Sequence, residues 1–352
     1  MSARKITGLL IAVLVFSAGL PAKTKPPVSY TVPVLELDGG RKLVFERSFS
    51  SEREVKPNRG FWNKVVDVIA GAPEFRRLVR PYSVAVDSRG RIIVSDPGVP
   101  GVHIFDFIGQ KYKFLSRPEG KDSLKVPQCV TVDKQDNIYV TDSESGKIFV
   151  YEPGGKLRKV IGSLKGGEGF FKRPTGIAVD SDAQRIYVTD TLRNKIYVVD
   201  MQGSVMQTIG KPGTGEGEFN YPTELRLQGQ QLIVVDAMNF RIQVLDRSGR
   251  FQYSIGHLGD ATGDMFRPKG VSVDSEGHIY AADGSFNVVQ VFNQQGQLLY
   301  YFGEKGTGFG DFQLPAGIFI DHNDRVYVVD SLNRRVQVFQ YFAAHGQPGG
   351  VQ

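Results

Sequence analysis

Apolar residues occur along most of the chain in short runs, each bounded by glycine, aspartate, asparagine or proline. The runs are rich in β-branched and aromatic residues, as in RIYVTD at 185–190 and KIYVVD at 195–200. Such runs are typical of antiparallel strands joined by hairpins. The spacing of an amphipathic helix is absent from them, and glycines fall where helix interiors would be. The pattern therefore predicts an all-β domain.

The strand-like runs belong to a unit that occurs six times. Each unit begins at a proline, and the six openings are PYSVAVD at 81, PQCVTVD at 127, PTGIAVD at 174, PTELRLQ at 222, PKGVSVD at 268 and PAGIFID at 315. Two further strand-like runs follow in every unit, and a fourth follows where the unit is complete. Four short strands in about 47 residues make one blade of a β-propeller, and six blades are enough to close a ring. Paired-helix repeats have a similar period, but the helical pattern is missing.

A glycine-rich stretch, GKPGTGEGEFNYP at 210–222, raises the alternative of a phosphate-binding loop. Such loops lead into a helix, whereas this stretch ends at a proline and leads into a strand-like run. The same stretch recurs before the prolines of three other units, so we interpret it as the crossover between blades, with glycines for turns of positive φ. Large apolar residues three positions before each proline are expected to anchor these crossovers: Phe171, Phe219, Met265 and Phe312.

Three stretches of the repeat match a known blade signature, P-x-G-I-A-V-D, then I-Y-V-x-D, then N-x-R-I-Q-V-F. They are Pro174–Asp180, Ile186–Asp190 and Asp330–Phe339. Through them the chain resembles the NHL-repeat family of six-bladed propellers over residues 80–342. The resemblance implies the fold more than the chemistry, because the family includes protein binders, RNA binders and a few enzymes.

The last unit supplies only three strands and stops near Phe342, which would leave its outer edge unpaired. The stretch RKLVFERSF at 41–49 lies outside the six units and looks like a strand. We therefore expect residues 41–50 to form the outer strand of the last blade and to join the two ends of the chain.

The remaining segments complete the predicted organisation. Between the closing strand and the first blade, Phe61, Trp62, Val65, Val66 and Ile69 share one face of a helical pattern, which predicts a short helix packed on the propeller. The fold prediction is an all-β, six-bladed β-propeller at 80–342 with a short N-terminal helical segment. Its other parts are a linker at 23–40, a helical connector at 51–79 and a tail at 343–352.

Residues 1–22 have the pattern of an export signal. Arg4 and Lys5 precede an apolar stretch from Ile6 to Phe16, and small residues follow it. The apolar stretch is shorter than the roughly 20 residues of a membrane-spanning helix, so a cleaved signal peptide is favoured over a retained membrane anchor. We expect an exported protein, periplasmic or extracellular, that meets the membrane only through this segment if it is not cleaved.

The net charge and the cysteine content point to no particular partner and to no disulfide within the chain. The chain has 43 basic and 37 acidic residues, and without Arg4 and Lys5 its formal net charge falls from +6 to +4. That charge is too small to predict a polyanionic partner. The single cysteine, Cys129, cannot form an intrachain disulfide and lies in an apolar run, so we expect a small buried side chain.

We predict no catalytic, cofactor-binding or metal-binding residues. The five histidines do not fall at positions that would bring two of them together as zinc ligands. Two sets of aspartates recur from blade to blade and could suggest calcium, but identical placement in each blade favours hydrogen bonds within turns. The sets are Asp87, Asp133, Asp180, Asp274 and Asp321, and Asp96, Asp142, Asp190, Asp236, Asp283 and Asp330.

A departure from the repeat marks the innermost strand of the fourth blade. Glu224 and Arg226 occupy positions that carry small residues in most other units. Two residues apart on a strand, they point the same way, toward the channel. A desolvated charge costs several kcal/mol unless it is paired, so we predict a mutual or water-bridged ion pair. A ligand site or a catalytic role in the channel is the alternative.

Large apolar residues in the loops between second and third strands suggest a contact surface for another protein. They are Leu192, Met238, Phe240, Phe286 and Leu332. Basic residues expected on the same face, such as Arg193 and Arg241, would suit single-stranded RNA, but acids on that face and the export signal argue against nucleic acid.

The sequence as a whole favours an exported, non-enzymatic propeller that acts as a scaffold or recognises another protein of the cell envelope or extracellular space. The alternative is a metal-dependent lyase or lactonase-like enzyme whose site lies in the channel near Glu224 and Arg226.

Overall fold

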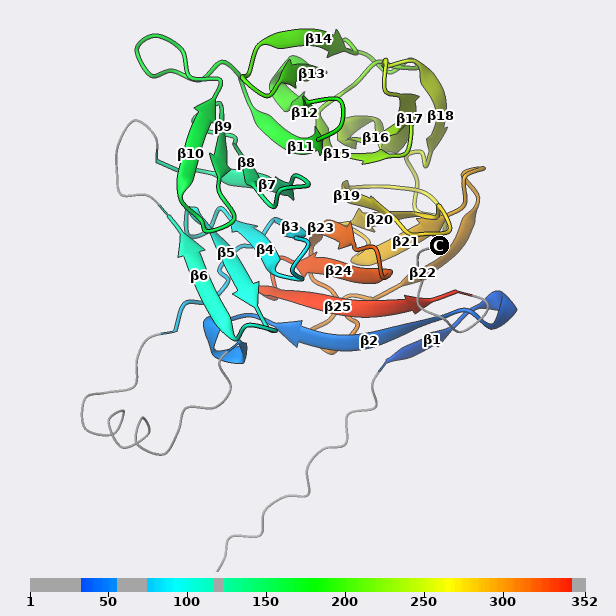
Figure 1. Ribbon diagram of the computed structural model, residues 1–352. Coiled ribbons are helices and arrows are strands. Elements are labelled where there is room, and N and C mark those ends of the chain that lie inside the picture. The colour runs from blue at the N-terminus through cyan, green and yellow to red at the C-terminus, as the bar shows by residue number, and fades with distance from the viewer. Residues whose placement is uncertain (1–32, 56–74, 117–122, 344–352) are drawn as a thin grey trace, which may run out of the picture. The chain divides into compact units, whose positions relative to one another are not determined.

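The computed structural model describes residues 33–55, 75–116 and 123–343, and within them the strands form five four-stranded sheets and one five-stranded sheet (Figure 1). Neighbouring strands in every sheet are antiparallel. Each sheet is one blade of a β-propeller, as the six repeats predict, and the blades are numbered here in chain order.

Blades one to three each consist of four consecutive strands. Blade one contains β3 (Ser83–Val86), β4 (Ile92–Asp96), β5 (Gly101–Asp106) and β6 (Lys111–Leu115). Blade two contains β7 (Pro127–Val132), β8 (Ile138–Asp142), β9 (Lys147–Tyr151) and β10 (Leu157–Ile161). Blade three contains β11 (Pro174–Asp180), β12 (Arg185–Asp190), β13 (Lys195–Asp200) and β14 (Val205–Ile209). The second and third strands are buried on both faces between neighbouring blades, whereas each fourth strand is exposed or half-buried except for its last residue.

Blades four and five repeat this arrangement. Blade four contains β15 (Pro222–Gln228), β16 (Gln231–Asp236), β17 (Arg241–Asp246) and β18 (Phe251–Ile255). Blade five contains β19 (Pro268–Val273), β20 (Ile279–Asp283), β21 (Val288–Phe292) and β22 (Leu298–Phe302). In blades three and four the second and third strands are joined by single 3-10 turns, η3 (Thr191–Arg193) and η4 (Ala237–Asn239).

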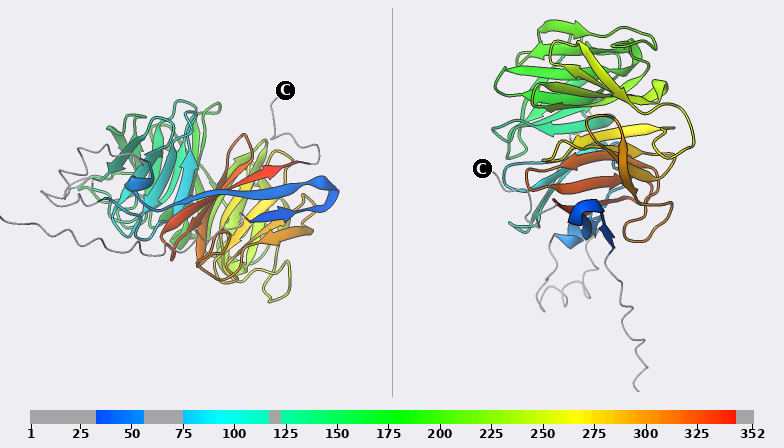
Figure 2. Two further views of the ribbon diagram at one scale, coloured as in Figure 1. Left: turned by 90° about the horizontal axis from the view of Figure 1, so that it is seen from below. Right: turned by 90° about the vertical axis from the view of Figure 1, so that its right-hand side faces the viewer.

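Blade six combines the two ends of the propeller sequence. It contains β23 (Pro315–Ile320), β24 (Arg325–Asp330) and β25 (Arg335–Phe342), and β2 (Lys42–Phe49) pairs with β25, as the pattern of residues 41–49 predicts. Figure 2 shows β2 and β25 side by side. A fifth strand, β1 (Val34–Glu36), pairs with β2 and lies inside the segment that we expected to be a linker. Its three residues are too few for a recognisable strand pattern.

The N-terminal expectations are tested only in part. No α-helix occurs in residues 33–55, 75–116 and 123–343, whose other helical turns are η1 (Asp38–Gly40) and η2 (Glu52–Glu54). The predicted short helical segment is therefore not supported, and its apolar face at 61–69 lies outside the described residues, as do the expected export signal and the C-terminal tail. None of the helical turns in the described part is long and apolar enough to cross a membrane.

The innermost strands close the ring. Each first strand contacts the first strand of the next blade, and β23 of blade six contacts β3 of blade one. The glycine of the P-x-G opening permits this close approach: a Cβ at Gly317 would lie 2.7 Å from the carbonyl oxygen of Tyr82. The Gly317 N–H donates to that same oxygen at 2.8 Å, so the first and last blades are joined by backbone.

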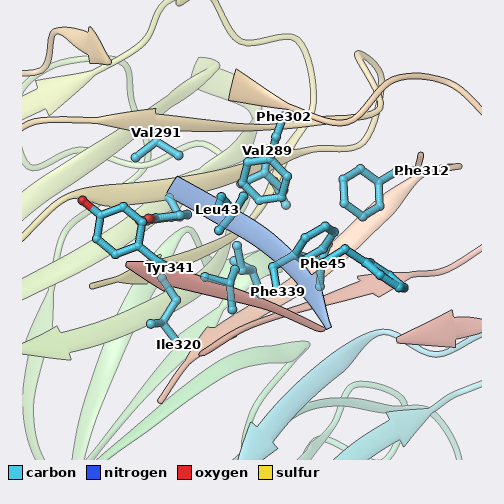
Figure 3. Packing of buried hydrophobic residues seen from close by; sticks show 14 residues of the cluster. Leu43, Phe45, Val289, Val291, Phe302, Phe312, Ile320, Phe339 and Tyr341 are labelled. Carbon is cyan, nitrogen blue, oxygen red and sulfur yellow. The ribbon is translucent and has the colours of Figure 1, made fainter. Parts of the chain in front are cut away.

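The hydrophobic core consists of six clusters, and each lies between two neighbouring blades. Strand β2 contributes to two of them. Leu43 and Phe45 pack with blade five residues such as Val291 and Phe302, as Figure 3 shows, whereas Phe49 packs against blade one. The four predicted crossover anchors are all buried, which confirms that assignment: Phe171, Phe219, Met265 and Phe312.

Candidate functional site

The third residue of each repeat, on the innermost strand, contributes to one ring of six residues around the channel. Going round the blades, its members are Ser83, Cys129, Gly176, Glu224, Gly270 and Gly317. The three glycines add no side chain at this level, and neighbouring backbones approach them closely: a Cβ at Gly176 would lie 2.9 Å from the Cα of Glu224. Glu224 is 2% exposed, so its carboxylate is almost fully removed from water.

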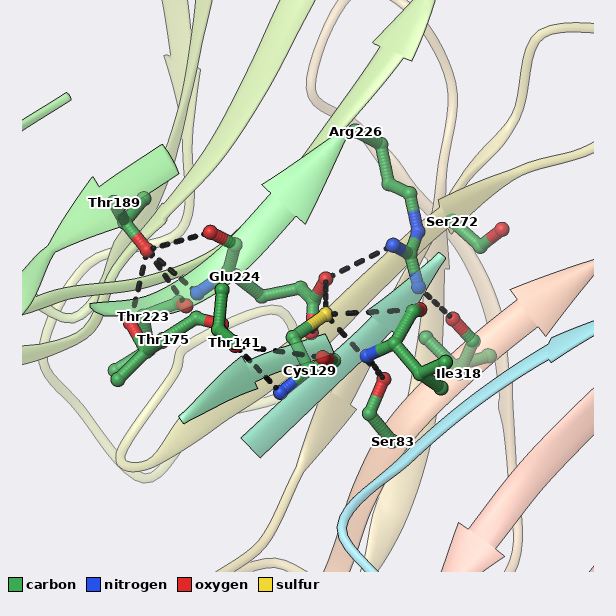
Figure 4. A network of polar contacts seen from close by, with 12 residues as sticks. Ser83, Cys129, Thr141, Thr175, Thr189, Thr223, Glu224, Arg226, Ser272 and Ile318 are labelled. Carbon is green, nitrogen blue, oxygen red and sulfur yellow. Dashed lines mark hydrogen bonds and ion pairs between the residues drawn. The ribbon is translucent and has the colours of Figure 1, made fainter. Parts of the chain in front are cut away.

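The Glu224 carboxylate has two partners in the channel (Figure 4). Arg226 Nη1 lies 3.0 Å from Oε1, which confirms the predicted ion pair. The Cys129 thiol of blade two donates to the same oxygen at 3.2 Å. Blade three contributes Gly176 at this level, and this allows a side chain of blade four to reach blade two. Glu224 and Cys129 occupy the same position of their units, and closure of the ring brings them into contact.

Arg226 extends from the ion pair toward blade six, two blades away around the ring. Its Nη2 donates to the backbone carbonyl of Ile318 in blade six at 3.1 Å, and its guanidinium carbon lies 5.9 Å from the centre of the Phe319 ring. The Arg226 Nε is buried and has no hydrogen-bond partner among the described residues. Glu224 and Arg226 thus connect blade four to blades two and six.

Burial dominates the electrostatics of this cluster. It raises the pKa of Glu224 above its usual value, against the opposing effect of the Arg226 charge. Burial, aided by the Glu224 charge, raises the pKa of the Cys129 thiol to about 12. A thiol with that pKa is not a nucleophile at neutral pH, and Cys129 is fully buried, as its apolar run predicts.

Hydroxyl groups connect the first blades beside this cluster. Thr141 Oγ1 of blade two donates to the Thr175 carbonyl of blade three at 2.5 Å, and Thr189 Oγ1 donates to the Thr223 carbonyl of blade four at 3.1 Å. Ser95 makes the corresponding bond from blade one to Gln128 of blade two. These bonds are structural, since each satisfies a buried backbone carbonyl.

The recurrent aspartates are also structural. Asp87 accepts the backbone N–H groups of Arg89 and Arg91 in its own turn, as predicted. The second set does more than stabilise a turn: Asp96 accepts the N–H groups of Val79 and Arg80, which precede the innermost strand of its blade. Equivalent bonds from the incoming crossover are made to Asp142, Asp190, Asp236, Asp283 and Asp330.

The described histidines lie apart, each with a local partner. His103 contacts Tyr112, His278 contacts Asp274, and His257 lies 2.8 Å from Asp264. Within the described part of the chain, no three histidine, cysteine, aspartate or glutamate side chains are grouped so that they could hold a metal ion.

The candidate protein-binding residues lie at the turns between second and third strands. Leu192, Met238 and Leu332 stand two positions after the recurrent aspartate in blades three, four and six, and they are 37%, 51% and 56% exposed. Phe240 and Phe286 are half-buried. The Phe240 ring lies 6.1 Å from that of the exposed Phe266, which precedes the first strand of blade five. We call Leu192, Met238 and Leu332 the turn surface.

Several basic residues on the same face hold crossovers in place. Arg241 contacts Asp236 and the carbonyls of Gly215 and Glu218, and Arg335 makes matching bonds in blade six. Arg193 donates to the Phe170 carbonyl. Sequence reasoning missed this role, although the recurrence of arginine at the start of the third strand in blades four and six was a usable signal.

Comparisons with known families agree with this architecture. A family described as 6-bladed beta-propeller matches residues 180–242, and the NHL repeat matches residues 124–151. No curated protein sequence matches the chain.

Solved structures of the same fold include enzymes and binding proteins. A virginiamycin B lyase from Staphylococcus aureus is 14% identical, with a TM-score of 0.55 over 85% of this chain and 99% of the lyase chain. An auxiliary nutrient binding protein from Bacteroides thetaiotaomicron is 14% identical, with a TM-score of 0.57 over 74% of this chain and 69% of its own. A hydrazine synthase chain from Kuenenia stuttgartiensis is also 14% identical, with a TM-score of 0.55 over 76% of this chain and 97% of that chain. At these identities the likeness shows the fold alone.

Proposed function

Because the chain is a six-bladed β-propeller that carries an NHL repeat, we propose that it is a non-enzymatic interaction module that binds another protein through the turn surface. The observation that carries the proposal is the exposure of Leu192, Met238 and Leu332 at equivalent positions of three blades. Large apolar side chains that repeat on one face are costly to expose, and the buried centre of an interface is more apolar than the rest of a protein surface.

The local structure explains why these side chains point outward. The Met238 and Leu332 N–H groups donate to the carbonyls of Asn220 and Gln313 in the preceding crossovers, at 3.0 and 3.1 Å. The turns are therefore held by backbone, and their apolar side chains are not needed for the fold. A rigid, pre-formed surface of this kind loses little entropy when it binds a partner.

The channel supports a structural role more than a catalytic one. Its buried acid, guanidinium and thiol pair with one another, and the thiol is protonated at neutral pH. The competing function, a metal-dependent lyase or lactonase-like enzyme, rests on the fold shared with the lyase and on the unpartnered Arg226 Nε.

The proposed partner belongs to the cell envelope or the extracellular space. This part of the proposal rests on the export pattern of residues 1–22. The propeller would meet the membrane only through that segment, if it is retained. Nucleic acid is not an expected partner.

Site-specific photo-crosslinking in native envelopes tests the proposal. A photoreactive residue at position 192, 238 or 332 is expected to crosslink one and the same protein, and the L192D/M238D/L332D variant is expected to lose that protein in co-purification. The matched control is I108D/M206D/L299D, which places three charges on exposed apolar positions away from the turn surface. Equal recovery of the partner with both triple variants would show that the wrong surface was chosen.

A further inference from the structure

Three arginines stand at the entrance of the channel in alternate blades. The residue before the proline that opens each repeat is Arg80 in blade one, Arg173 in blade three and Arg267 in blade five. In blades two, four and six the same position carries Val126, Tyr221 and Leu314. All three arginines are exposed. Each arginine comes one to three residues before the innermost strand of its blade, which places all three at the same end of the channel.

A fourth cation completes the group. Lys269 follows Pro268 in blade five, is half-buried, and its Nζ lies 5.7 Å from the centre of the Tyr82 ring of blade one. Its stem packs against Gly284, where an added Cβ would lie 3.1 Å from Cδ and Cε. We call Arg80, Arg173, Arg267 and Lys269 the mouth cluster.

The Tyr82 hydroxyl belongs to the same group. Burial raises the pKa of Tyr82 above its ordinary value; the Glu224 charge raises it further, and the charges of Arg173 and Arg267 lower it. The charges of Glu224 in blade four and of Arg173 and Arg267, which precede blades three and five, therefore all act on the Tyr82 hydroxyl. Within the described residues the Tyr82 hydroxyl forms no hydrogen bond.

The mouth cluster lacks anionic partners. Among the described residues, no carboxylate lies within ion-pair distance of any of its four side chains. The nearest aspartates of the repeat, Asp96, Asp190 and Asp283, are buried and accept the backbone N–H groups of Arg80, Arg173 and Arg267 at 2.9, 2.9 and 3.0 Å.

The pKa of Lys269 is lowered in these surroundings, which hold other cations and, among the described residues, no carboxylate partner. Burial, aided by the positive charges of Arg267 and Arg80, lowers the pKa of Lys269 to about 8. A lone surface arginine is simply solvated, but a half-buried lysine whose charged neighbours are both cations is unfavourable until an anion arrives. Guanidinium groups bind phosphate and carboxylate oxygens in pairs, and a tyrosine hydroxyl adds a donor.

We propose that the mouth cluster, with the Tyr82 hydroxyl, binds the phosphate or carboxylate groups of a small polyanionic ligand at the channel entrance. The site does not depend on the turn surface or on a protein partner. Its cations come from blades one, three and five, so a ligand with several anionic groups can contact more than one blade at once.

Calorimetric titration of the purified protein with pyrophosphate and with citrate, each against chloride at equal ionic strength, tests the proposal. Binding of either probe beyond chloride is expected. Preference for pyrophosphate identifies a phosphate ligand, and preference for citrate identifies a carboxylate ligand. If neither probe binds more tightly than chloride, the proposal is wrong.

Two variants that remove the same charge distinguish binding at the mouth cluster from non-specific electrostatic attraction of the anion to the protein. R173Q/R267Q is expected to weaken binding of the preferred probe about tenfold or more, because two charge-assisted contacts are lost. K156Q/K305Q removes the same charge from exposed lysines away from the mouth and is expected to change the affinity about twofold or less. Equal losses in both variants would mean that only the net charge matters. All four positions are exposed, so neither variant should alter folding, which circular dichroism checks.

The pH dependence of citrate binding tests Lys269 itself. Its ammonium is mostly charged at pH 7 and mostly neutral at pH 9, so binding should weaken over this range. The arginines stay protonated, the Tyr82 hydroxyl stays neutral because its pKa is raised, and the citrate carboxylates stay ionised. K269M is expected to bind more weakly at pH 7 and to show no such fall. A fall of the same size in K269M would exclude Lys269 from the site.

Discussion

At the scale of single residues, the most unusual feature is a buried charge where three other blades have glycine. Glu224 is accommodated because its carboxylate is paired with Arg226 at 3.0 Å and accepts a hydrogen bond from Cys129. Arg226 in turn is held by the Ile318 carbonyl. The pair gains little net energy after desolvation, but its position is specific, since it links three blades.

Removal of one partner should be costly and pH-dependent. R226M leaves the Glu224 carboxylate buried and unpaired, so we expect the free energy of unfolding at pH 7 to fall by about 3 kcal/mol. The pKa of Glu224 is already raised by burial and rises further without Arg226. A carboxyl with a raised folded-state pKa destabilises the fold at high pH and ceases to do so as it becomes protonated. The deficit of R226M should therefore shrink as the pH is lowered from 7 toward 5.

Urea unfolding of R226M across this pH range provides the measurement. The matched control is R250M, which removes an arginine whose ion pair with Asp246 lies at the surface, and it should cost less than about 1 kcal/mol at every pH. A deficit in R226M that does not vary with pH would mean that lost packing, rather than an unpaired carboxylate, is responsible.

At the scale of elements, β2 is part of the propeller core although it lies far in sequence from the other strands of blade six. It pairs with β25 along its whole length and places side chains in two inter-blade clusters. Phe45 faces blade five, and Phe49, 1% exposed, contacts Phe105 of blade one with ring centres 4.8 Å apart. The strand therefore contributes to the core on both sides of blade six, besides covering its edge.

Truncation of Phe49 should measure that contribution. We expect F49A to lower the free energy of unfolding by about 3–5 kcal/mol, because a large side chain is deleted from a packed core. F266A, at a position 53% exposed, is the matched control and should cost less than about 1 kcal/mol. Chemical denaturation followed by circular dichroism measures both free energies of unfolding. Similar decreases for the two variants would contradict the assignment of β2 as a core strand.

At the scale of the whole molecule, stability is distributed around the ring. The six clusters each involve two adjacent blades, and the contact of β23 with β3 makes the last blade the neighbour of the first. Within the described residues the channel contains an ion pair and hydroxyl groups rather than a set of metal ligands. Apolar packing between blades is thus the main source of stability.

Metal removal should therefore leave the molecule unchanged. We expect elemental analysis of the purified protein to find no stoichiometric zinc or calcium, and the melting temperature to be the same before and after treatment with a chelator. Stoichiometric metal, together with a lyase or lactonase activity that chelation abolishes, would favour the enzymatic alternative and contradict an interaction module.

Much of this architecture was predictable because the repeat supplies the same information six times. The blade boundaries, the buried crossover anchors and the closure by residues 41–49 follow from periodicity and from the missing fourth strand. Strand β1 was not predicted, since three residues carry no pattern. The ion pair of Glu224 with Arg226 was predictable, because the two residues are two positions apart on one strand. The contacts of Glu224 with Cys129 and of Arg226 with Ile318 were not, because ring closure brings those residues together.

The sequence by itself determined the fold class, the number of blades and the residues that depart from the repeat, because local strand patterns and their period require no knowledge of distant contacts. Only the tertiary structure decided which departures meet. Arg80, Arg173 and Arg267 are about two blades apart in sequence, and their gathering at one channel mouth depends on the closed ring. Closure is a long-range property, set by packing between blades, and no single repeat contains it.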